Sequence, residues 1–299
     1  MAAVRALWCL VIAGCGVEVG PAGPWVPIEQ IAGQLAAETG AMPATSRMLP
    51  RDSLRVVTYN VDEENPDLEP AQLAAAIADD PALARADVFL LQEEEAHPEE
   101  GRSRTSKLAE LLGLAYVYVP SHPKGTGTHG LAILSAYPIT NVEKMDLPLA
   151  GPDRRIAVSA NILVGDRSLH VIDVYLEACA SGVKRIAQLS PAVDALTAPV
   201  LVTGDFNMTW VEFLSGPPEP CVPILSGTSA SDQATVVDSY MGALGFDEPA
   251  AHVGPTAHAF GLDVRLDGIY PRGLAYSFGG LERVGPSDHW PMWIDVELP

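Results

Sequence analysis

Five short segments of the chain carry carboxylate, amide and imidazole side chains, and each lies at or beside an apolar run typical of a β-strand. If these strands share a sheet, seven of the polar side chains meet at one rim. A cluster rich in hard oxygen ligands, with a single imidazole, suits Mg²⁺-assisted chemistry on a phosphate. The segments are Thr58-Tyr59-Asn60, Leu91-Gln92-Glu93, Gly204-Asp205-Phe206-Asn207, Leu266-Asp267-Gly268-Ile269 and Ser287-Asp288-His289.

Each segment also has an ordinary structural interpretation. In that interpretation Asn60 caps a turn, Glu93 is one of three successive surface acids, and Asp205 belongs to an Asx-rich turn. Asp267 and His289 then form a structural hydrogen-bonded pair. The functional interpretation therefore depends on the joint occurrence of all five segments.

The elements that must position these residues alternate between strands and helices. Glu93 is expected just past the end of its strand, and residues 121–130 are expected to form a mobile loop. Many strands with interleaved helices and no internal repeat predict an α/β fold with sizeable sheets. We expect strands at 54–59, 87–91, 116–119, 131–134, 155–164, 169–175, 200–203 and 292–298, and helices at 70–77, 107–112 and 186–196.

Composition places the 299-residue chain among folded proteins, with 48% hydrophobic and 19% charged residues and a formal charge of −20. The acidic excess is uneven, because Asp205 and the residues after it include 13 acidic but only three basic side chains. A broad non-specific grip on DNA needs a basic surface, and none is visible.

The N-terminus predicts export. Arg5 precedes an apolar stretch that is too short to span a bilayer but suits a signal peptide. The stretch ends Leu10-Val11-Ile12-Ala13-Gly14-Cys15, which resembles a bacterial lipobox. We expect residues 1–14 to be the signal, Cys15 to be lipidated, and residues 15–53 to form a tether, a short helix and a linker before a domain at 54–299. A simple cleaved signal peptide is the alternative.

Two cysteines, Cys179 and Cys221, remain after the lipobox. An exported protein permits a disulfide between them. Two separate buried thiols are the equal alternative.

With their neighbours, these motifs resemble the endonuclease/exonuclease/phosphatase superfamily, whose members include secreted deoxyribonucleases, AP endonucleases and neutral sphingomyelinases. The resemblance covers residues 54–298 and implies a four-layer α/β/β/α sandwich of two mixed sheets flanked by helices (DNase I-like). The site is then expected where the loops of the two sheets meet. The motifs are Val57-Thr58-Tyr59-Asn60, Leu91-Gln92-Glu93, Gly130-Leu131-Ala132-Ile133-Leu134-Ser135 with Tyr137-Pro138-Ile139, Gly204-Asp205-Phe206-Asn207, Leu266-Asp267-Gly268-Ile269 and Ser287-Asp288-His289-Trp290-Pro291.

The resemblance also implies a role for each residue. Glu93 is the principal ligand of Mg²⁺, with Mn²⁺ as the alternative ion, and Asp288 and Asn60 assist it. His289 contacts the scissile phosphate and is oriented by Asp267. Asp205 positions or deprotonates the attacking water, and Asn207 donates a hydrogen bond to a phosphoryl oxygen.

The chain departs from the family pattern at two positions. Tyr175 stands where secreted deoxyribonucleases and sphingomyelinases have a histidine that helps the leaving oxygen, and it is included among the catalytic residues. A phenol is a poorer proton donor near neutral pH. Ala136 replaces a usual arginine, and we expect Arg154 and Arg155 to restore part of that charge.

Taken together, the sequence predicts a Mg²⁺-dependent phosphoesterase of the bacterial cell envelope that cleaves phosphodiesters or phosphomonoesters. Its expected substrate is a phospholipid, a small diester or a nucleic acid, with membrane attachment through the N-terminal lipid and no protein partner. The alternatives are a secreted endonuclease and a non-catalytic surface binding protein with the same fold. Loops such as 121–130 and 215–255 are expected to set specificity.

Overall fold

The computed structural model describes residues 19–41, 51–62, 69–178, 180–208, 212–213, 223–224, 232–249, 253–259 and 262–299. The signal segment 1–14, Cys15, Cys179 and Cys221 lie outside these residues. Lipidation and the disulfide therefore stay predictions.

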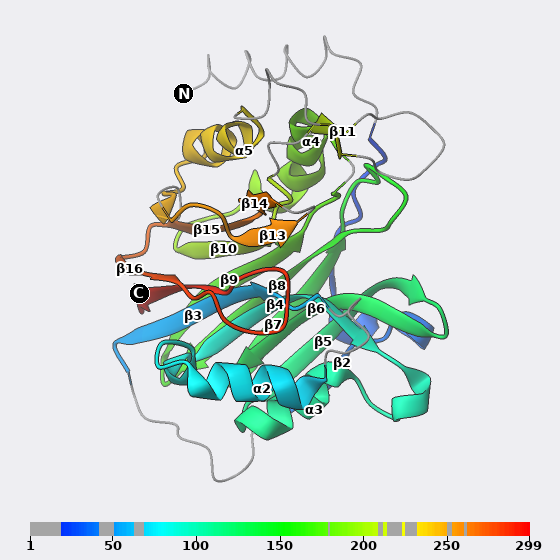
Figure 1. Cartoon of the computed structure of the whole chain (residues 1–299), viewed down its shortest axis with the longest axis vertical. Coiled ribbons are helices and arrows are strands. Elements are labelled where there is room, and N and C mark those ends of the chain that lie inside the picture. The colour runs from blue at the N-terminus through cyan, green and yellow to red at the C-terminus, as the bar shows by residue number, and fades with distance from the viewer. Residues whose placement is uncertain are drawn as a thin grey trace.

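Two mixed sheets form the centre of the molecule (Figure 1). Strands β9 and β10 of the first sheet run parallel, as do β3 and β4 of the second, and their other neighbours are antiparallel. The six-stranded sheet has the order β1 (Trp25–Pro27), β7 (Ile139–Asp146), β8 (Ile156–Val164), β9 (Arg167–Tyr175), β10 (Val200–Asp205), β15 (Asp267–Arg272). The seven-stranded sheet has the order β16 (Tyr276–Leu281), β17 (Met292–Glu297), β3 (Ser53–Asn60), β4 (Val88–Ala96), β6 (Gly127–Ser135), β5 (Ala115–Lys124), β2 (Glu38–Gly40).

Helices cover the outer face of each sheet, so the expected four-layer α/β/β/α sandwich is confirmed. Figure 1 shows α4 (Gly182–Val193) and α5 (Asp232–Ala243) above the six-stranded sheet, and α2 (Pro70–Asp79) and α3 (Arg104–Leu112) below the seven-stranded one. Two short hairpins pair β11 (Glu212–Phe213) with β12 (Pro223–Ile224) and β13 (Ala257–Ala259) with β14 (Leu262–Val264). Single 3₁₀ turns lie at Leu83–Arg85 and Pro98–Glu100.

Strand periodicity explains the layers, because successive side chains of a strand point to opposite faces. Val56 and Leu90 pack between the sheets, whereas Val57 and Leu91 pack against α2 and α3. Both faces of each sheet are thus buried, which makes the strands nearly continuous apolar runs. Each fully buried aliphatic side chain contributes about 2 kcal/mol to stability.

The helix ends follow the sequence signals. Pro70 opens α2 at its first turn, and Ser103 Oγ accepts a hydrogen bond from Ser106 N at the start of α3. Gly113 ends α3 in the left-handed conformation with φ 70°, as its sequence position predicts. No helix among the described residues is both long and apolar enough to span a membrane.

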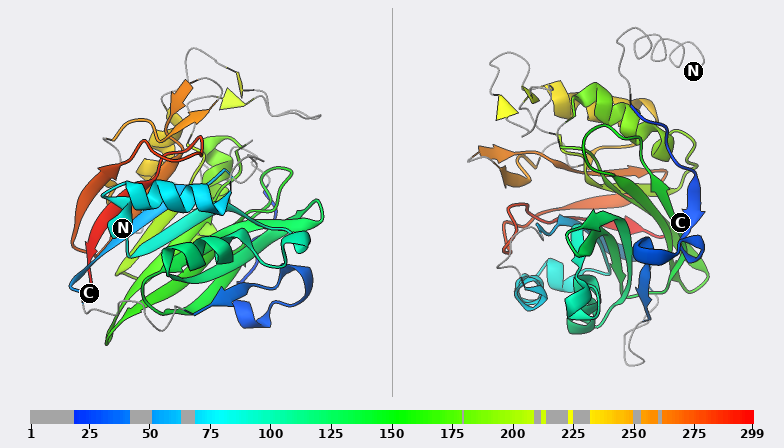
Figure 2. Two further views of the ribbon diagram at one scale, coloured as in Figure 1. Left: turned by 60° about the horizontal axis from the view of Figure 1, so that its bottom comes forward. Right: turned by 90° about the vertical axis from the view of Figure 1, so that its right-hand side faces the viewer.

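The segment before residue 54 differs from its expected form. In place of one short helix it contains two 3₁₀ turns, Ile28–Gln30 and Gly33–Leu35, and two edge strands. Strand β1 pairs with β7 in one sheet and β2 pairs with β5 in the other. The right-hand view of Figure 2 shows this blue segment passing along the side of both sheets.

The prediction of a mobile loop at 121–130 is also wrong. Strands β5 and β6 continue through it and pair as far as Lys124 and Gly127. The physical reason is that the polar residues of the segment alternate across the two faces of a hairpin whose turn needs glycine. Gly125 sits in that turn with φ 57°.

Candidate active site

Three neighbouring strands of the six-stranded sheet present site residues side by side. Tyr175 ends β9 and Asp205 ends β10, and these two residues are partners in the parallel register. Asp267 begins β15 and is the antiparallel partner of Asp205. The strand register therefore places a phenol and two carboxylates in one row.

The seven-stranded sheet contributes Asn60 and Glu93, and Asn60 connects the two sheets. Asn60 Nδ2 donates to Glu93 Oε1 at 2.9 Å and to Asp205 Oδ2 at 3.0 Å. Its Oδ1 accepts from the backbone N–H of Asp62 at 3.0 Å. Asn60 is fully buried, so one amide sets the spacing of two carboxylates from different sheets.

Glu93 lies inside β4 rather than just past its end, which corrects the sequence prediction. The β4–β6 register shifts between Leu91 and Glu94, and Glu93 has φ 62°. A non-glycine residue in this left-handed region is uncommon and costs energy that the surrounding structure must offset. The bulge turns the Glu93 carboxylate toward the rim, where it is only partly buried.

Asn207 holds Asp205. Its backbone N–H donates to Asp205 Oδ1 at 2.7 Å, and Nδ2 donates to Leu176 O at 2.9 Å and to Asp205 Oδ2 at 3.3 Å. Asn207 also has a positive φ of 50°. Because both amide hydrogens have acceptors within the chain, the structure favours a role in orienting Asp205 over the expected contact with a phosphoryl oxygen.

His289 is oriented from both sides. Its Nδ1 lies 2.9 Å from Asp267 Oδ2, so the imidazole directs Nε2 away from that carboxylate. Its backbone N–H donates to Ser287 Oγ at 3.0 Å, and that hydroxyl donates to Asn60 O at 2.8 Å. Thr256 Oγ1 in turn accepts from Asp267 N at 3.1 Å.

Burial and close charges set the protonation of this group. Burial, reinforced by Asp267, raises the pKa of Asp205 to about 7. Burial alone would lower the pKa of His289, but the adjacent Asp267, together with Asp205 and Asp288, outweighs it and raises that pKa to about 10. At neutral pH the site thus holds a cationic imidazole beside a carboxyl group that exchanges its proton readily.

Two sets of residues could hold a metal ion. Ligand atoms of Asp205, Asp267 and His289 lie within 4.8 Å of one another. However, all three residues are buried, and Asp267 is paired with His289. The second set is Glu93, Asp288 and Asn60.

The second set fits a hard cation better. Glu93 is partly exposed, and the Asp288 side chain is 46% exposed beside His289. Burial raises the pKa of Asp288, the nearby His289 opposes this shift and the Glu93 carboxylate adds to it. Two carboxylates close enough to repel each other match the oxygen donors that Mg²⁺ prefers, and the Asn60 amide assists by holding Glu93 Oε1.

Tyr175 is enclosed by charged groups. Its hydroxyl donates to Glu93 Oε1 at 2.6 Å, and the guanidinium carbon of Arg155 lies 4.0 Å from its ring centroid. Burial and the Glu93 charge raise the pKa of Tyr175 well above its ordinary value, so the phenol stays neutral. Arg155 is buried beside the site, whereas Arg154 is exposed and pairs with Asp146, so of these two arginines Arg155 alone supplies charge to the site.

The sequence favours solvent exposure for His129 in a loop, with contact to the site as the alternative, and the structure buries His129 beside the site. It lies in β6, is 4% exposed, and its ring centroid is 5.8 Å from that of Tyr175. The alternation of His122, Lys124 and His129 around a Gly-Thr-Gly turn was the available signal for a hairpin.

A buried polar network lies between the sheets beneath the site. Gln92 Nε2 donates to Asp173 Oδ1 at 2.6 Å, and both residues are fully buried. Burial raises the pKa of Asp173 well above its usual range. A neutral Asp173 avoids an uncompensated charge at this depth.

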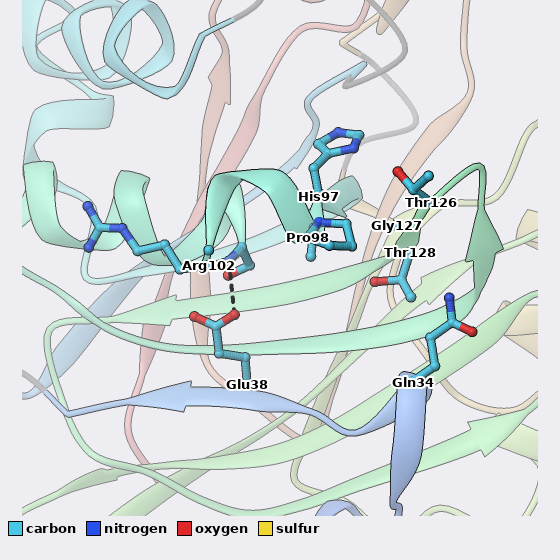
Figure 3. A pocket seen from close by; sticks show the side chains of 11 residues that line it. Gln34, Glu38, His97, Pro98, Arg102, Thr126, Gly127 and Thr128 are labelled. Atoms are coloured by element: carbon cyan, nitrogen blue, oxygen red, sulfur yellow. Dashed lines mark hydrogen bonds between the residues drawn. The ribbon is translucent and has the colours of Figure 1, made fainter.

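A separate cavity of about 260 Å³ lies elsewhere and contains none of the site residues (Figure 3). Its walls include Gln34, His97 and the β5–β6 turn at Thr126–Thr128. Glu38 in its wall already accepts hydrogen bonds from Ser103 N and Tyr116 OH. The cavity therefore offers no free carboxylate for the chemistry of the rim.

In comparisons with known proteins, a single family model covers all of the site residues from Asn60 to His289. A family model described as Endonuclease/Exonuclease/phosphatase family matches residues 57–289. The "Uncharacterized protein YbhP" of Escherichia coli (strain K12) is 30% identical over 169 residues, 52% of this chain and 67% of that protein. An endonuclease/exonuclease/phosphatase family protein from Leptotrichia buccalis C-1013-b shares the fold with a TM-score of 0.56 and 14% identity, over 82% of this chain and 99% of that one. D. rerio TDP2 complexed with single strand DNA product gives a TM-score of 0.55 and 18% identity, over 83% and 100%.

Proposed function

Because the chain belongs to the endonuclease/exonuclease/phosphatase family, we propose that it hydrolyses phosphodiesters by in-line attack of an activated water. Members of the family are metal-dependent phosphoric ester hydrolases, and the chain is an enzyme of this class. The observation that carries the proposal is the Asn60 amide, which holds Glu93 Oε1 at 2.9 Å and Asp205 Oδ2 at 3.0 Å. It places the proposed metal ligand and the proposed base next to each other.

Asp205 is the proposed base. With its pKa raised to about 7 by burial and by Asp267, its carboxylate can take a proton from water near neutral pH. Asn60 and Asn207 hold its two oxygens and so fix its direction.

His289 is the proposed electrostatic partner of the phosphate. Asp267 keeps the imidazole protonated and oriented, which leaves Nε2–H to donate to a non-bridging phosphoryl oxygen. Such a fixed donor stabilises charge that develops in the transition state.

Glu93 and Asp288, assisted by Asn60, are the residues that would hold Mg²⁺ or Mn²⁺. When bound, the ion neutralises charge on the phosphoryl group. A phosphomonoester is the alternative substrate of the same site.

The proposed location is the bacterial cell envelope, with attachment to the membrane through lipid on Cys15. The lipobox-like segment before Cys15 supports this. A phospholipid or small diester is then the proposed substrate, and the charge of −20 weighs against long DNA. A nuclease is the second candidate, favoured by the fold shared with TDP2 complexed with single strand DNA product.

Hydrolysis of an aryl phosphodiester by the purified chain tests the proposal. We expect Mg²⁺-dependent turnover that EDTA abolishes and that Glu93→Ala lowers by about 10³-fold or more. Asp205→Asn and His289→Ala should each lower the rate about 10²- to 10⁴-fold, and circular dichroism should show that both variants remain folded. Glu99→Gln, at an exposed acid just after the same strand, is the control and should keep full activity.

A substrate panel with and without chelator separates the candidates. The panel contains sphingomyelin, inositol phosphates, single-stranded DNA and aryl esters. Turnover of DNA alone would support the nuclease. If no member of the panel is hydrolysed, the proposal fails and the non-catalytic binding protein is the remaining interpretation. A near wild-type rate for Asp205→Asn or His289→Ala would show that the roles are wrongly assigned.

A further inference from the structure

The β5–β6 hairpin places a buried histidine directly behind Tyr175. The His129 ring is tilted by 39° to that of Tyr175, with 5.8 Å between the centroids. In the strand register His129 is the partner of Glu95 on one side and of His122 on the other. The reaction proposed above assigns no role to this imidazole.

The two nitrogens of the His129 ring have different surroundings. Nδ1 is sealed from solvent and has no hydrogen-bond partner among the described residues, whereas Nε2 is not one of the sealed, unpartnered atoms found there. A buried N–H without an acceptor is rarer in proteins than a buried acceptor without a donor. The favoured tautomer therefore leaves a lone pair on Nδ1 and carries the proton on Nε2.

The charge around the ring keeps it neutral. Burial lowers the pKa of His129 well below its usual range, and the nearby Arg155, Lys124 and His122 lower it further. A neutral imidazole with its proton on Nε2 is a hydrogen-bond donor that does not change with pH in the working range.

Tyr175 leaves a donor position unfilled. A phenol has one hydrogen to donate, and that of Tyr175 is directed to Glu93 Oε1 at 2.6 Å. With a pKa raised by burial and by Glu93, the phenol also keeps its proton. The Tyr175 hydroxyl therefore has no hydrogen left to donate to a leaving oxygen on this side of the site.

His129 lies at the far end of the site from the base. A line of contacts runs from Asp205 through Asn60 to Glu93, then to Tyr175 and the His129 ring. In-line displacement puts the attacking and leaving oxygens on opposite sides of phosphorus. With water at Asp205, a substrate that lies along this line of contacts has its leaving oxygen toward His129.

We propose that His129 Nε2–H donates a hydrogen bond to the leaving oxygen of a phosphodiester with an unactivated alcohol as leaving group. The inference rests on the proposed function. The water oxygen bonds to phosphorus as the ester P–O bond breaks. The water proton passes to Asp205, and the alkoxide, stabilised by the Nε2–H donor, takes its proton from solvent.

A leaving-group comparison tests the role of His129. The probes are methyl p-nitrophenyl phosphate, which has an activated leaving group, and methyl phenyl phosphate, which does not. His129→Phe keeps a ring against Tyr175 but removes the donor, whereas His129→Gln keeps an N–H donor. We expect His129→Phe to lose kcat about tenfold to a hundredfold more on the phenyl ester than on the nitrophenyl ester, and His129→Gln to recover part of the difference.

A structural role for His129 gives a different pattern. Equal losses on both esters for both variants, or no loss on either, would overturn the inference while the proposed function stands. His122→Phe, at the neighbouring imidazole whose Nδ1 lies 3.2 Å from Arg154 O, is the matched control and should not change the ratio of the two rates. An inactive wild-type chain on every ester would instead remove the proposed function and this inference together.

Discussion

At the residue scale, the site contains a buried ion pair between Asp267 and His289 beside the proposed base, Asp205. His289 and Asp267 are 6% and 3% exposed, and each would be costly to bury alone. Their contact at 2.9 Å offsets that cost and keeps the imidazole protonated. Burial and the Asp267 charge raise the pKa of Asp205 whereas the cationic His289 lowers it, so the protonation states of the three residues depend on one another.

The Asp267–His289 pair predicts a pH-dependent stability. The pKa of His289 rises from 6.5 to about 10 on folding, chiefly because Asp267 outweighs burial, so its contribution is fully present below pH 6.5 and is lost as pH rises toward 10. Asp267→Asn should therefore lower the free energy of unfolding by roughly 3 kcal/mol near pH 6 and by much less near pH 10.

Urea unfolding in EDTA across this pH range measures the effect of Asp267→Asn. Asp166→Asn, in the exposed turn between β8 and β9, should track the wild type throughout. A difference between wild type and Asp267→Asn that does not shrink with pH would show that His289 does not carry the stabilising proton.

At the element scale, backbone irregularities aim the site side chains. The bulge in β4 turns Glu93, and a left-handed Asn207 lets its own amide hold Asp205. Gly204, between Thr203 and Asp205 in β10, allows a close approach of β10 to β9 at the site. It has φ 141°, and a Cβ there would lie 2.0 Å from Val174 O in β9.

Gly204→Ala should therefore destabilise the fold strongly. The obstructing atom is backbone, so no flexible side chain can move aside, and the free energy of unfolding should fall by about 3 kcal/mol or more. Gly165→Ala is the matched control, because Gly165 has a positive φ of 65° but nothing within 4 Å of an added Cβ. It should cost only about 1 kcal/mol. Equal costs in chemical denaturation would contradict the close approach of β9 and β10.

At the scale of the whole molecule, one N-terminal segment adds a short strand to one edge of each sheet. Strands β1 and β2 pair with β7 and β5, and Ile28 between them is 6% exposed in the core between the sheets. Open edges of large sheets invite pairing between molecules, and burial of Ile28 alone contributes about 2 kcal/mol.

Removal of residues 1–50 should therefore lower stability by about 2 kcal/mol or more and promote association. Removal of residues 1–18 is the control, because it leaves β1 and β2 in place. Thermal unfolding and light scattering measure the two effects. Equal unfolding temperatures for the two shortened chains would show that the edge strands contribute little.

Much of the fold and site was predictable because the signals are local. Pro70 and Gly113 mark helix ends through their own backbone preferences, and apolar runs mark the strands that carry Asn60 and Asp205. The segment at 121–130 was misjudged because glycines and polar residues suit both a loop and an exposed hairpin end. Only pairing with β4 decides between them.

The sequence by itself determined which residues carry the chemistry, their order along the chain and the α/β class, because residue types and hydrophobic periodicity are properties of neighbouring positions. Only the tertiary structure decided which contacts each of these residues makes, and therefore which role each is proposed to have. The Asn60 bridge, the use of the Asn207 amide within the chain and the burial of His129 against Tyr175 all depend on the distance between strands far apart in the sequence. That distance follows from how the two sheets pack, which no local spacing specifies.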